Sequence, residues 1–439
     1  MVEQAQVSGP RAGGDRLKGK VLWIPRMSHG GAKTFAAAFR SIGVNAQECP
    51  DADMRAMELG SRVTSGDECY PEMVTLGTFL RLAERPGFDP QKEAFFMPTA
   101  GGPCRFGQYA PFVRKVLDEV GLANVDVFAP TSADGYKGVG GSTGELMRTA
   151  WRALVVSDLM RKFLHKTRPY EKSAGDADKA HEDSLNDLCG VLEKPGMKPK
   201  EKLDALVACM TRCRDRFRAV PADYSEPRPL IGVVGEIFCR LNTFSNEDFI
   251  RRIEALGGEG WLSDITEWVW YTNFETFKRI RRAGKQVSLQ MLGAAIKNKI
   301  QRADEHAILK VVEPDFEGYN EPHSIKEVLD YAMPYLPHDG ALGEMVLSVG
   351  KAIYLYHHGA DGIVDISPFT CMNGITCEAV YPRVCKEHDH IPIKNFYFDG
   401  TQKDLDTGIG IFLELARTYR RRKKPVRRLP QYFPAGIKA

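Results

Sequence analysis

Short apolar runs, rich in β-branched and aromatic residues, alternate along the chain with longer stretches in which apolar residues recur every three or four positions. The short runs have the length and composition of buried strands, and the longer stretches have the period of amphipathic helices. This alternation is typical of an α/β fold with open, mostly parallel sheets. We predict six strands, at Val21 to Pro25, Ala94 to Pro98, Val125 to Pro130, Leu230 to Ile237, Gly362 to Ile366 and Ile393 to Phe398.

The predicted strands fall into two groups of three, which indicates two Rossmann-like lobes with a cleft between them. Ligands of such sheets bind beyond the carboxyl ends of the strands, where loops lead into helices. Two other parts of the chain have helical spacing, and we interpret them as helical insertions. The expected divisions are a disordered N-terminal tail at 1–17, an α/β domain at 18–150, a helical insertion at 151–229, a second α/β domain at 230–418 with a helical insertion at about 267–335, and a basic C-terminal tail at 419–439.

Composition and charge indicate a globular protein without a membrane span and with a basic C-terminal end. The 439 residues are 43% hydrophobic and 27% charged, as in an ordinary globular protein. The apolar runs are too short to span a membrane, and the polar start lacks a signal peptide, so we expect a cytoplasmic protein without membrane contact. The net charge of +3 hides an asymmetry, because residues 417–438 hold nine Lys and Arg and no acid. This basic end is either a solvated tail or a docking site for an acidic partner or nucleotide, and a nucleic-acid partner is not expected.

Three of the ten cysteines lie where the chain leads into a predicted helix. Cys69 precedes a helix start, Cys104 follows the second predicted strand, and Cys371 follows the fifth. Disulfides are not expected in a reducing cytoplasm, so such thiols are either metal ligands or inert packing. A helix N-terminus, or the neighbouring Arg105, is expected to lower the thiol pKa and favour the thiolate. Three thiolates would leave one iron of a 4Fe-4S cluster open to substrate. The spacing alone leaves both interpretations open.

The motifs around these cysteines occur together with others in a fixed order. Five segments carry the pattern, namely Cys69-Tyr-Pro71, Gly101-Gly-Pro-Cys-Arg-Phe-Gly-Gln-Tyr109, Val234-Gly-Glu-Ile-Phe-Cys-Arg-Leu-Asn242, Glu254-Ala-Leu-Gly-Gly258 and Ser367-Pro-Phe-Thr-Cys371. They resemble the motifs of acyl-CoA dehydratase activase-related proteins, which are related to 2-hydroxyacyl-CoA dehydratases and double-cubane cluster proteins. The matches touch most of both predicted α/β domains, and several ordered motifs are far more specific than any single one.

The resemblance implies a cofactor, a partner and a type of reaction. The cofactor would be an oxygen-sensitive iron-sulfur cluster in the interlobe cleft, either 4Fe-4S or a double-cubane 8Fe-9S cluster, held by Cys69, Cys104 and Cys371 with Arg105 beside it. Electrons would come from a separate ATP-hydrolysing activase of the ASKHA type. The chain would then act as a reductase or as a dehydratase-like lyase on an acyl-CoA thioester or a small molecule, paired in a homodimer or with a related subunit. The alternative is a non-catalytic cluster-bearing scaffold or electron relay.

Further residues are candidates for the same site. Glu236 at a strand end and Glu68 beside Cys69 are candidate proton-handling carboxylates, although an ordinary cap or solvent contact is the more common role for such residues. Cys239 and Cys377 are candidates for extra contacts with the cluster. These four side chains extend the predicted site beyond its three ligands.

Two glycine-containing segments invite comparison with nucleotide-binding loops. The segment from Trp23 to Thr34 follows a strand as a phosphate-binding loop does, but Met27 and Ala32 stand where that loop requires glycine. The segment from Gly135 to Gly144 lacks the third glycine of the dinucleotide fingerprint, although it can still cradle an anion. We therefore expect no ATP site in this chain.

The remaining cysteines are interpreted as packing or surface residues. Cys209 and Cys213 lie beside the apolar stripe of their own predicted helix, which favours burial. Cys385, His388 and His390 have no second ligand pair at zinc-like spacing, which favours a surface loop.

Overall fold

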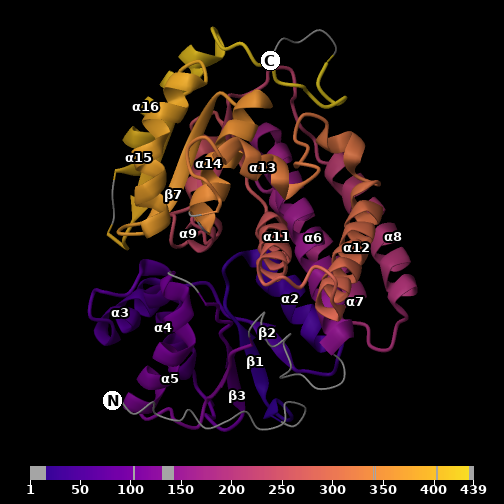
Figure 1. Ribbon diagram of the computed structural model, residues 1–439, viewed down its shortest axis with the longest axis vertical. Coiled ribbons are helices and arrows are strands. Elements are labelled where there is room, and N and C mark those ends of the chain that lie inside the picture. Colours follow the sequence, from indigo (N-terminus) through magenta and orange to yellow (C-terminus); the bar gives the residue numbers. More distant parts are fainter. Residues whose placement is uncertain are drawn as a thin grey trace.

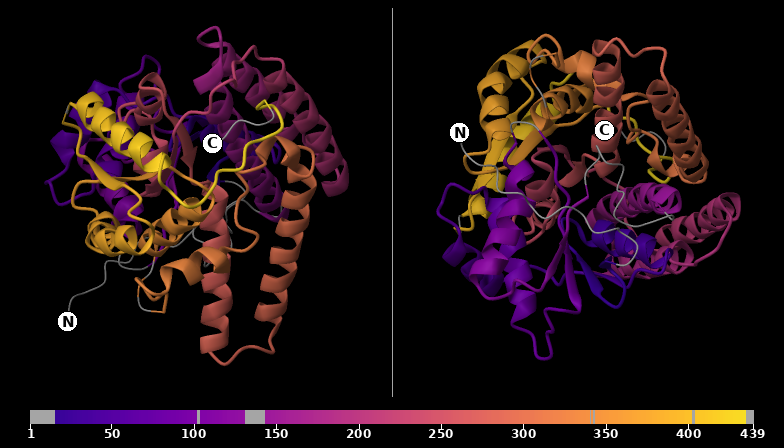
Figure 2. Two further views of the ribbon diagram at one scale, coloured as in Figure 1. Left: turned by 90° about the horizontal axis from the view of Figure 1, so that it is seen from above. Right: turned by 60° about the horizontal axis from the view of Figure 1, so that its bottom comes forward.

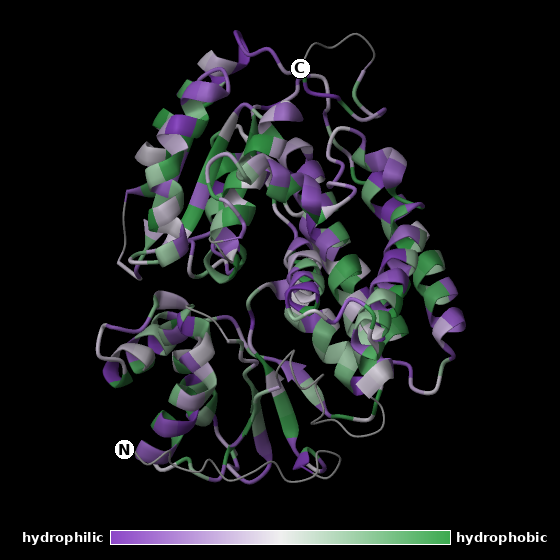
Figure 3. Ribbon diagram, viewed as in Figure 1, coloured by the Kyte–Doolittle hydropathy of each residue, from purple (hydrophilic) through white to green (hydrophobic). Residues whose placement is uncertain are grey.

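The computed structural model describes residues 16–101, 104–130, 143–339, 341, 343–401 and 404–434. It contains two four-stranded sheets, both entirely parallel, and many helices, which confirms the predicted α/β fold class with two Rossmann-like lobes. The strand order is β2-β1-β3-β4 in the first sheet and β6-β5-β7-β8 in the second. Figure 1 shows the first lobe at the bottom and the second at the top, with a layer of long helices beside them. Hydrophobic residues gather in the strands and on the helix faces that cover them (Figure 3).

The first lobe is built from β1 (Val21–Ile24), β2 (Ala46–Glu48), β3 (Glu93–Phe96), β4 (Asp126–Phe128), α2 (His29–Arg40), α3 (Met54–Val63), α4 (Tyr70–Ala83), the 3-10 helix η1 (Arg105–Gln108) and α5 (Tyr109–Glu119). Strands β1 and β3 are almost fully buried, as is expected of the inner strands of a parallel sheet. The rings of Phe79 in α4 and Phe95 in β3 stack with their centroids 4.2 Å apart. Helix α4 is thereby fixed against the sheet.

The second lobe is built from β5 (Leu230–Gly235), β6 (Glu259–Leu262), β7 (Gly362–Pro368), β8 (Ile393–Phe398), α9 (Ile237–Leu241), α10 (Phe249–Ala255), α13 (Ile325–Ala332), α14 (Glu344–His357), α15 (Met372–Glu387) and α16 (Leu405–Arg420). All six predicted strands are present, whereas β2 and β6 were not predicted. Both missed strands are short and poor in β-branched residues, because β2 reads Ala-Gln-Glu and β6 begins with Glu259 and Gly260.

Long helices connect the two lobes. They are α6 (Thr143–Thr167), α7 (Asp176–Leu192), α8 (Pro199–Arg218), α11 (Ile265–Arg282) and α12 (Leu289–Leu309). Helix α6 packs against α2 of the first lobe and against β6 of the second, so it bridges the two sheets. None of the helices in the described part of the chain is long and apolar enough to cross a membrane.

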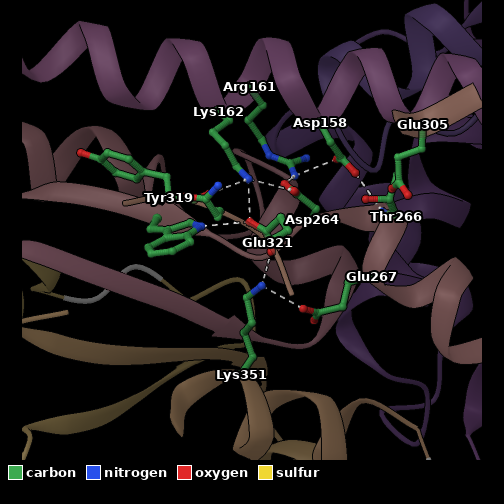
Figure 4. A network of polar contacts seen from close by, with 12 residues as sticks. Asp158, Arg161, Lys162, Asp264, Thr266, Glu267, Glu305, Tyr319, Glu321 and Lys351 are labelled. Carbon is green, nitrogen blue, oxygen red and sulfur yellow. Dashed lines mark hydrogen bonds and ion pairs between the residues drawn. The ribbon is translucent and has the colours of Figure 1, made fainter. Parts of the chain in front are cut away.

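A buried ion network joins α6 to the second lobe (Figure 4). Lys162 of α6 lies 2.6 Å from Glu321 and 3.3 Å from Asp264, measured from its Nζ to the carboxylate oxygens. Lys351 of α14 is fully buried and pairs with Glu321 and with Glu267 of α11. Burial alone would lower the pKa of both lysines, but the surrounding carboxylates raise it, so both ammonium groups stay charged. The network therefore fixes three helices relative to β6.

The basic C-terminal stretch folds back onto the second lobe. Lys423 Nζ lies 2.7 Å from Asp361 Oδ1, and Arg427 Nη2 lies 2.7 Å from Glu259 Oε2, with all four side chains buried. The prediction of a solvated tail at Arg420 to Lys424 is wrong for Lys423, because its acidic partner Asp361 belongs to the same chain. Residues 1–15 and 435–439 of the predicted tails lie outside the described residues.

Replacing Arg427 with Met should lower the free energy of unfolding by about 3–5 kcal/mol, because Glu259 would remain buried without its cation. The measurement is equilibrium urea unfolding. Lys424→Met is the matched control, since Lys424 is exposed and its pair with Asp389 should contribute less than about 1 kcal/mol. Adding Glu259→Gln to Arg427→Met should restore part of the loss. Equal, small effects of the two single substitutions would contradict the role assigned to Arg427.

Candidate functional site

Each of the three predicted cluster ligands lies at the start of a helix. Cys69 is the N-cap of α4, Cys371 is the N-cap of α15, and Cys104 is the N-cap of η1, which leads into α5. Cys69 and Cys371 are half-buried, and Cys104 is exposed. The three thiols therefore occupy the loop-to-helix positions that the sequence indicated. The only difference is the short 3-10 helix that separates Cys104 from α5.

Hydrogen-bond donors surround the sulfur atoms. The Tyr109 hydroxyl oxygen lies 2.6 Å from Cys69 Sγ. The backbone N–H of Phe106 donates to Cys104 Sγ at 3.5 Å, and backbone N–H groups in the first turn of α15 act to lower the pKa of Cys371. Such donors favour negative charge on sulfur and tune the potential of iron-sulfur clusters.

One carboxylate of the second lobe, that of Glu236, lies within electrostatic range of all three thiols. Burial is the largest cause of the raised pKa of Cys69, Cys104 and Cys371, and the charge of Glu236 raises the pKa of each further. Glu236 caps α9 by accepting hydrogen bonds from the next turn, and it follows Gly235, whose φ of +114° allows the sharp turn out of β5. The fold thus brings together four of the predicted site residues, two of the cysteines coming from the first lobe.

The two lobes touch beside these residues. Asn242, just after α9, donates from Nδ2 to the backbone oxygen of Arg26 at 2.7 Å. A small pocket lies at this boundary, and its lining includes Arg26, Val74 and Thr75 of the first lobe and Phe238 and Asn242 of the second. It has room for a water-sized group, so an acyl-CoA molecule does not fit it in this conformation.

Burial controls the protonation of the thiols. It raises the pKa of Cys69 and of Cys371 to about 12, and it raises the pKa of Cys104 as well. The sequence predicted the opposite direction, and that prediction is wrong because desolvation and the nearby carboxylates outweigh the helix N-termini. Arg105 does lower the pKa of Cys104, but its effect is smaller than that of burial. Metal binding at these thiols must therefore displace protons.

Glu344, the first residue of α14, joins Glu236 at the site. Its Oε1 accepts a hydrogen bond from the backbone N–H of Ile237 at 2.7 Å, and Asn373 Nδ2 donates to its Oε2 at 3.4 Å. Burial, followed by the charge of Glu236, raises the pKa of Glu344 to about 8. At neutral pH the Glu344 carboxyl therefore largely keeps its proton, and burial raises the pKa of the neighbouring Glu236 as well. Sequence reasoning missed Glu344, since its only local signal is a glycine followed by a helix start.

The two carboxylates near Cys69, those of Glu68 and Glu72, have pKa values shifted in opposite directions, which the sequence did not predict. Glu68 accepts hydrogen bonds from the backbone N–H groups of Ser65 and Gly66, so it caps its own loop, and its pKa is lowered. Glu72, one turn into α4, is buried instead, and burial raises its pKa to about 7. Glu72 Oε1 has no hydrogen-bond partner. Glu72 is thus a better candidate than Glu68 for handling protons.

The candidates for extra cluster contacts are both buried. Cys239 in α9 lies within the electrostatic reach of Cys371 and Cys69, and Cys377 in α15 lies within that of Cys371 and Glu344. Cys377 also donates from Sγ to the Met345 carbonyl at 3.5 Å, so its thiol already has a hydrogen-bond partner in the core.

Other predicted features have ordinary structural roles or cannot be placed. Cys209 and Cys213 are fully buried in the core, as predicted. The segment from Trp23 to Thr34 forms β1, a short loop and the start of α2, where Ser28 is the N-cap. Most of the segment from Gly135 to Gly144 lies outside the described residues.

A single metal ion and an iron-sulfur cluster require different arrangements of their ligands. Among the described residues, no three His, Cys, Asp or Glu side chains meet closely enough to hold one metal ion. This includes Cys385, His388 and His390, the latter two following the end of α15. A cluster carries its cysteine ligands on different irons, so Cys69 and Cys371 need not converge on one point.

Comparison of the chain with protein-family models and with curated proteins gives no match. The resemblance of its motifs to those of the dehydratase-related family therefore remains a prediction, and the site has to be judged by its chemistry.

The raised pKa of Glu344 predicts a pH-dependent stability. Between about pH 4.5 and pH 8 the folded metal-free protein keeps a proton that the unfolded chain has released, so this contribution is complete below pH 4.5 and is lost as the pH rises through 8. Glu344→Gln removes it. From pH 5 to pH 8.5, the free energy of unfolding of the wild type should fall by about 1–3 kcal/mol relative to that of Glu344→Gln.

Urea unfolding at a series of pH values measures this difference. Glu119→Gln, at an exposed position of α5, is the control, and its curve should run parallel to that of the wild type. A Glu344→Gln curve parallel to the wild type would contradict the protonated state of Glu344.

Proposed function

We propose that this chain is an iron-sulfur protein of the 2-hydroxyacyl-CoA dehydratase-like family that receives low-potential electrons from an ATP-dependent activase and reduces a bound substrate. The substrate class is an acyl-CoA thioester or a small molecule. The observation that supports the proposal is the position of Cys69, Cys104 and Cys371, each the N-cap residue of a helix. These cysteines would hold a 4Fe-4S or 8Fe-9S cluster, which when bound supplies one-electron reduction at low potential.

The protein's own groups would set the conditions for that chemistry. Tyr109 and the backbone N–H groups donate to the sulfurs and would favour the thiolate once the protons have left. Burial would keep water away and raise the cost of unbalanced charge. The side chains around the thiols thus favour reactions in which electron and proton arrive together.

Glu344 is the best proton donor of the site. Its carboxyl is protonated at neutral pH and lies beside Glu236, which holds its own position by capping α9. A donor with a pKa near the working pH is well suited to general acid catalysis. In the proposed reaction it would deliver a proton to the reduced substrate or to a leaving hydroxyl group.

The cluster hypothesis predicts brown protein with several iron and sulfide ions per chain after anaerobic preparation. Cys69→Ala, Cys104→Ala and Cys371→Ala should each remove most of the iron, because a cluster on three thiolates tolerates the loss of one poorly. Iron and sulfide analysis with EPR provides the measurement. Cys209→Ala is the matched control, since this thiol is buried in the core, and it should keep its iron. Colourless protein after anaerobic reconstitution, or equal iron loss from Cys209→Ala, would reject this ligand set.

The energy source would be a second protein. The loop after β1 lacks the glycines of an ATP-binding loop and forms an ordinary strand-to-helix connection. We expect no tight ATP binding and no ATP hydrolysis by this chain alone, and a change of its EPR spectrum when a reduced dimeric activase and ATP are added under anaerobic conditions. Robust intrinsic ATPase activity, or complete reduction by ferredoxin without ATP, would contradict this division of labour.

A non-catalytic electron relay is the second candidate, and the narrow pocket at the lobe boundary favours it. A relay needs no substrate pocket of its own, whereas an enzyme must open this boundary or bind substrate with a partner subunit. Turnover of an acyl-CoA or small-molecule acceptor by activase and this chain alone would support the enzyme. Reduction of the chain without turnover, until a further subunit is added, would support the relay.

A further inference from the structure

Arg240 of α9 is a buried cation without a partner. The residue is only 7% exposed. Within the described part of the chain, its guanidinium makes no hydrogen bond and no ion pair. The other buried arginines of the described residues, Arg152 and Arg427, each pair with a carboxylate. Buried charges are normally paired, because desolvation of a charge is costly. A buried arginine that lacks such a pair therefore indicates a binding site for an anion.

The terminal nitrogens of Arg240 are within reach of a ligand. Its Nε is sealed from solvent without a partner, whereas Nη1 and Nη2 keep exposed surface. The backbone of this turn is fixed, because Asn246 Nδ2 donates to the carbonyl oxygens of Cys239 and Arg240 at 2.9 and 3.1 Å. The Arg240 N–H donates in turn to the Glu236 carbonyl at 3.0 Å. An anion would thus meet a guanidinium on an ordered backbone, which lowers the entropic cost of binding.

Arg240 belongs to the second-lobe side of the candidate site. Figure 1 places α9 on the side of the second lobe that faces the first, and the right view of Figure 2 also shows the two lobes against each other. Burial raises the pKa of Glu236, Glu344 and Asp365, and the charge of Arg240 counteracts this in all three. Glu236 and Glu344 in turn act on the thiols of Cys104 and Cys371. An anion at Arg240 would therefore lie at the candidate site.

The neighbouring carboxyl groups limit the charge of that anion. A phosphate dianion would face Glu236, Glu344 and Asp365 at once, and like charges repel strongly where water is scarce. A carboxylate carries one charge, and its two oxygens match the planar fork of a guanidinium. The pocket beside α9, which Phe238 and Asn242 help to line, has room only for a small group. Charge and space therefore both favour a small organic acid over the phosphates of CoA.

We propose that Arg240 binds the carboxylate of a small organic acid at the boundary between the two lobes. The further step, that this acid is the molecule the protein reduces, rests on the proposed function. Within that function, the inference selects a small carboxylate-bearing molecule over an acyl-CoA thioester. Binding of the acid requires no cluster and can be measured on iron-free protein. Failure of the binding and failure of the cluster hypothesis are therefore separate results.

The test is isothermal titration calorimetry of the full-length chain with acetate, both as purified under anaerobic conditions and after iron has been removed with a chelator. A Kd of about 1 mM is within reach of so small a ligand. Arg240→Met should weaken binding at least about 10-fold, and Arg240→Lys should restore part of it, since lysine keeps the charge and loses the fork. Arg281→Met, at an exposed position of α11, is the matched control and should bind acetate as the wild type does.

Analogues of acetate define the specificity of the site. Acetamide has nearly the shape of acetate without its charge, so it should not bind. Inorganic phosphate at pH 7.5 should bind more weakly than acetate, because it is largely a dianion. Tighter binding of phosphate or of CoA than of acetate would overturn the proposal. It would also be overturned by a wild type that does not bind acetate, by unchanged binding in Arg240→Met, or by loss of acetate binding when the chain is loaded with iron.

Stability separates a binding role of Arg240 from a structural one. Arg240→Met removes a cation that makes no ion pair, so urea unfolding without acetate should show a much smaller loss of stability than Arg427→Met, which breaks a buried pair. Acetate should stabilise the wild type against urea and should leave Arg240→Met unchanged, because a ligand stabilises only a state that binds it. Equal losses of stability in the two variants, with equal stabilisation of both by acetate, would assign Arg240 a structural role and contradict the proposal.

Discussion

A fully buried lysine determines where the candidate site's proton donor lies. Lys351 of α14 has no exposed surface and pairs with Glu267 and Glu321, so any movement of α14 would separate buried charges. The same helix begins at Glu344, and the Tyr271 hydroxyl of α11 accepts a hydrogen bond from the N–H of Gly343 at 2.9 Å. The ion network therefore fixes α14, and the fixed start of α14 determines where the Glu344 carboxyl group lies beside Glu236. Although the network includes none of the thiols, it influences their electrostatic surroundings by fixing the helix that carries Glu344.

Burial has two opposite effects at the site. It partly shelters the thiols of Cys69 and Cys371 from water, which suits a sensitive cofactor, and it also makes their thiolates costly, because the nearby charges are mostly carboxylates. Arg105 and Arg240 are the cations that act on this group, Arg105 on Cys104 and Arg240 on the two carboxylates. Any further negative charge in this space would raise the pKa of Glu344. In the proposed function, arrival of an electron would therefore favour retention or uptake of a proton.

Local signals in the sequence predicted much of this structure, and the remainder depends on tertiary contacts. The long apolar strands and the placement of Cys69, Cys104 and Cys371 before helices follow from periodicity and loop residues, and the structure agrees. Whether the thiols are charged depends on burial, which no local pattern specifies, and this prediction had the wrong sign. Glu344 lies more than a hundred residues from Glu236 in sequence, so only the pairing of β5 with β7 and the packing of α14 reveal their proximity. The pairing of Arg427 with Glu259 could not be predicted for the same reason, since the two residues are far apart in sequence.

The start of α11 is held by buried contacts, whereas its end is exposed to solvent. At its start, Glu267 and Tyr271 are held by the ion network and by the loop before α14, whereas the outer turns and the following helix have no buried residue up to Gln301. Effects of contacts at separated positions usually add, unless a shared element has two arrangements. The described contacts show one arrangement of α11, anchored by buried ions that resist displacement. A substitution confined to the outer turns of α11 and α12 should therefore leave the protonation of Glu344 unchanged, because those turns share no contact with the buried ions.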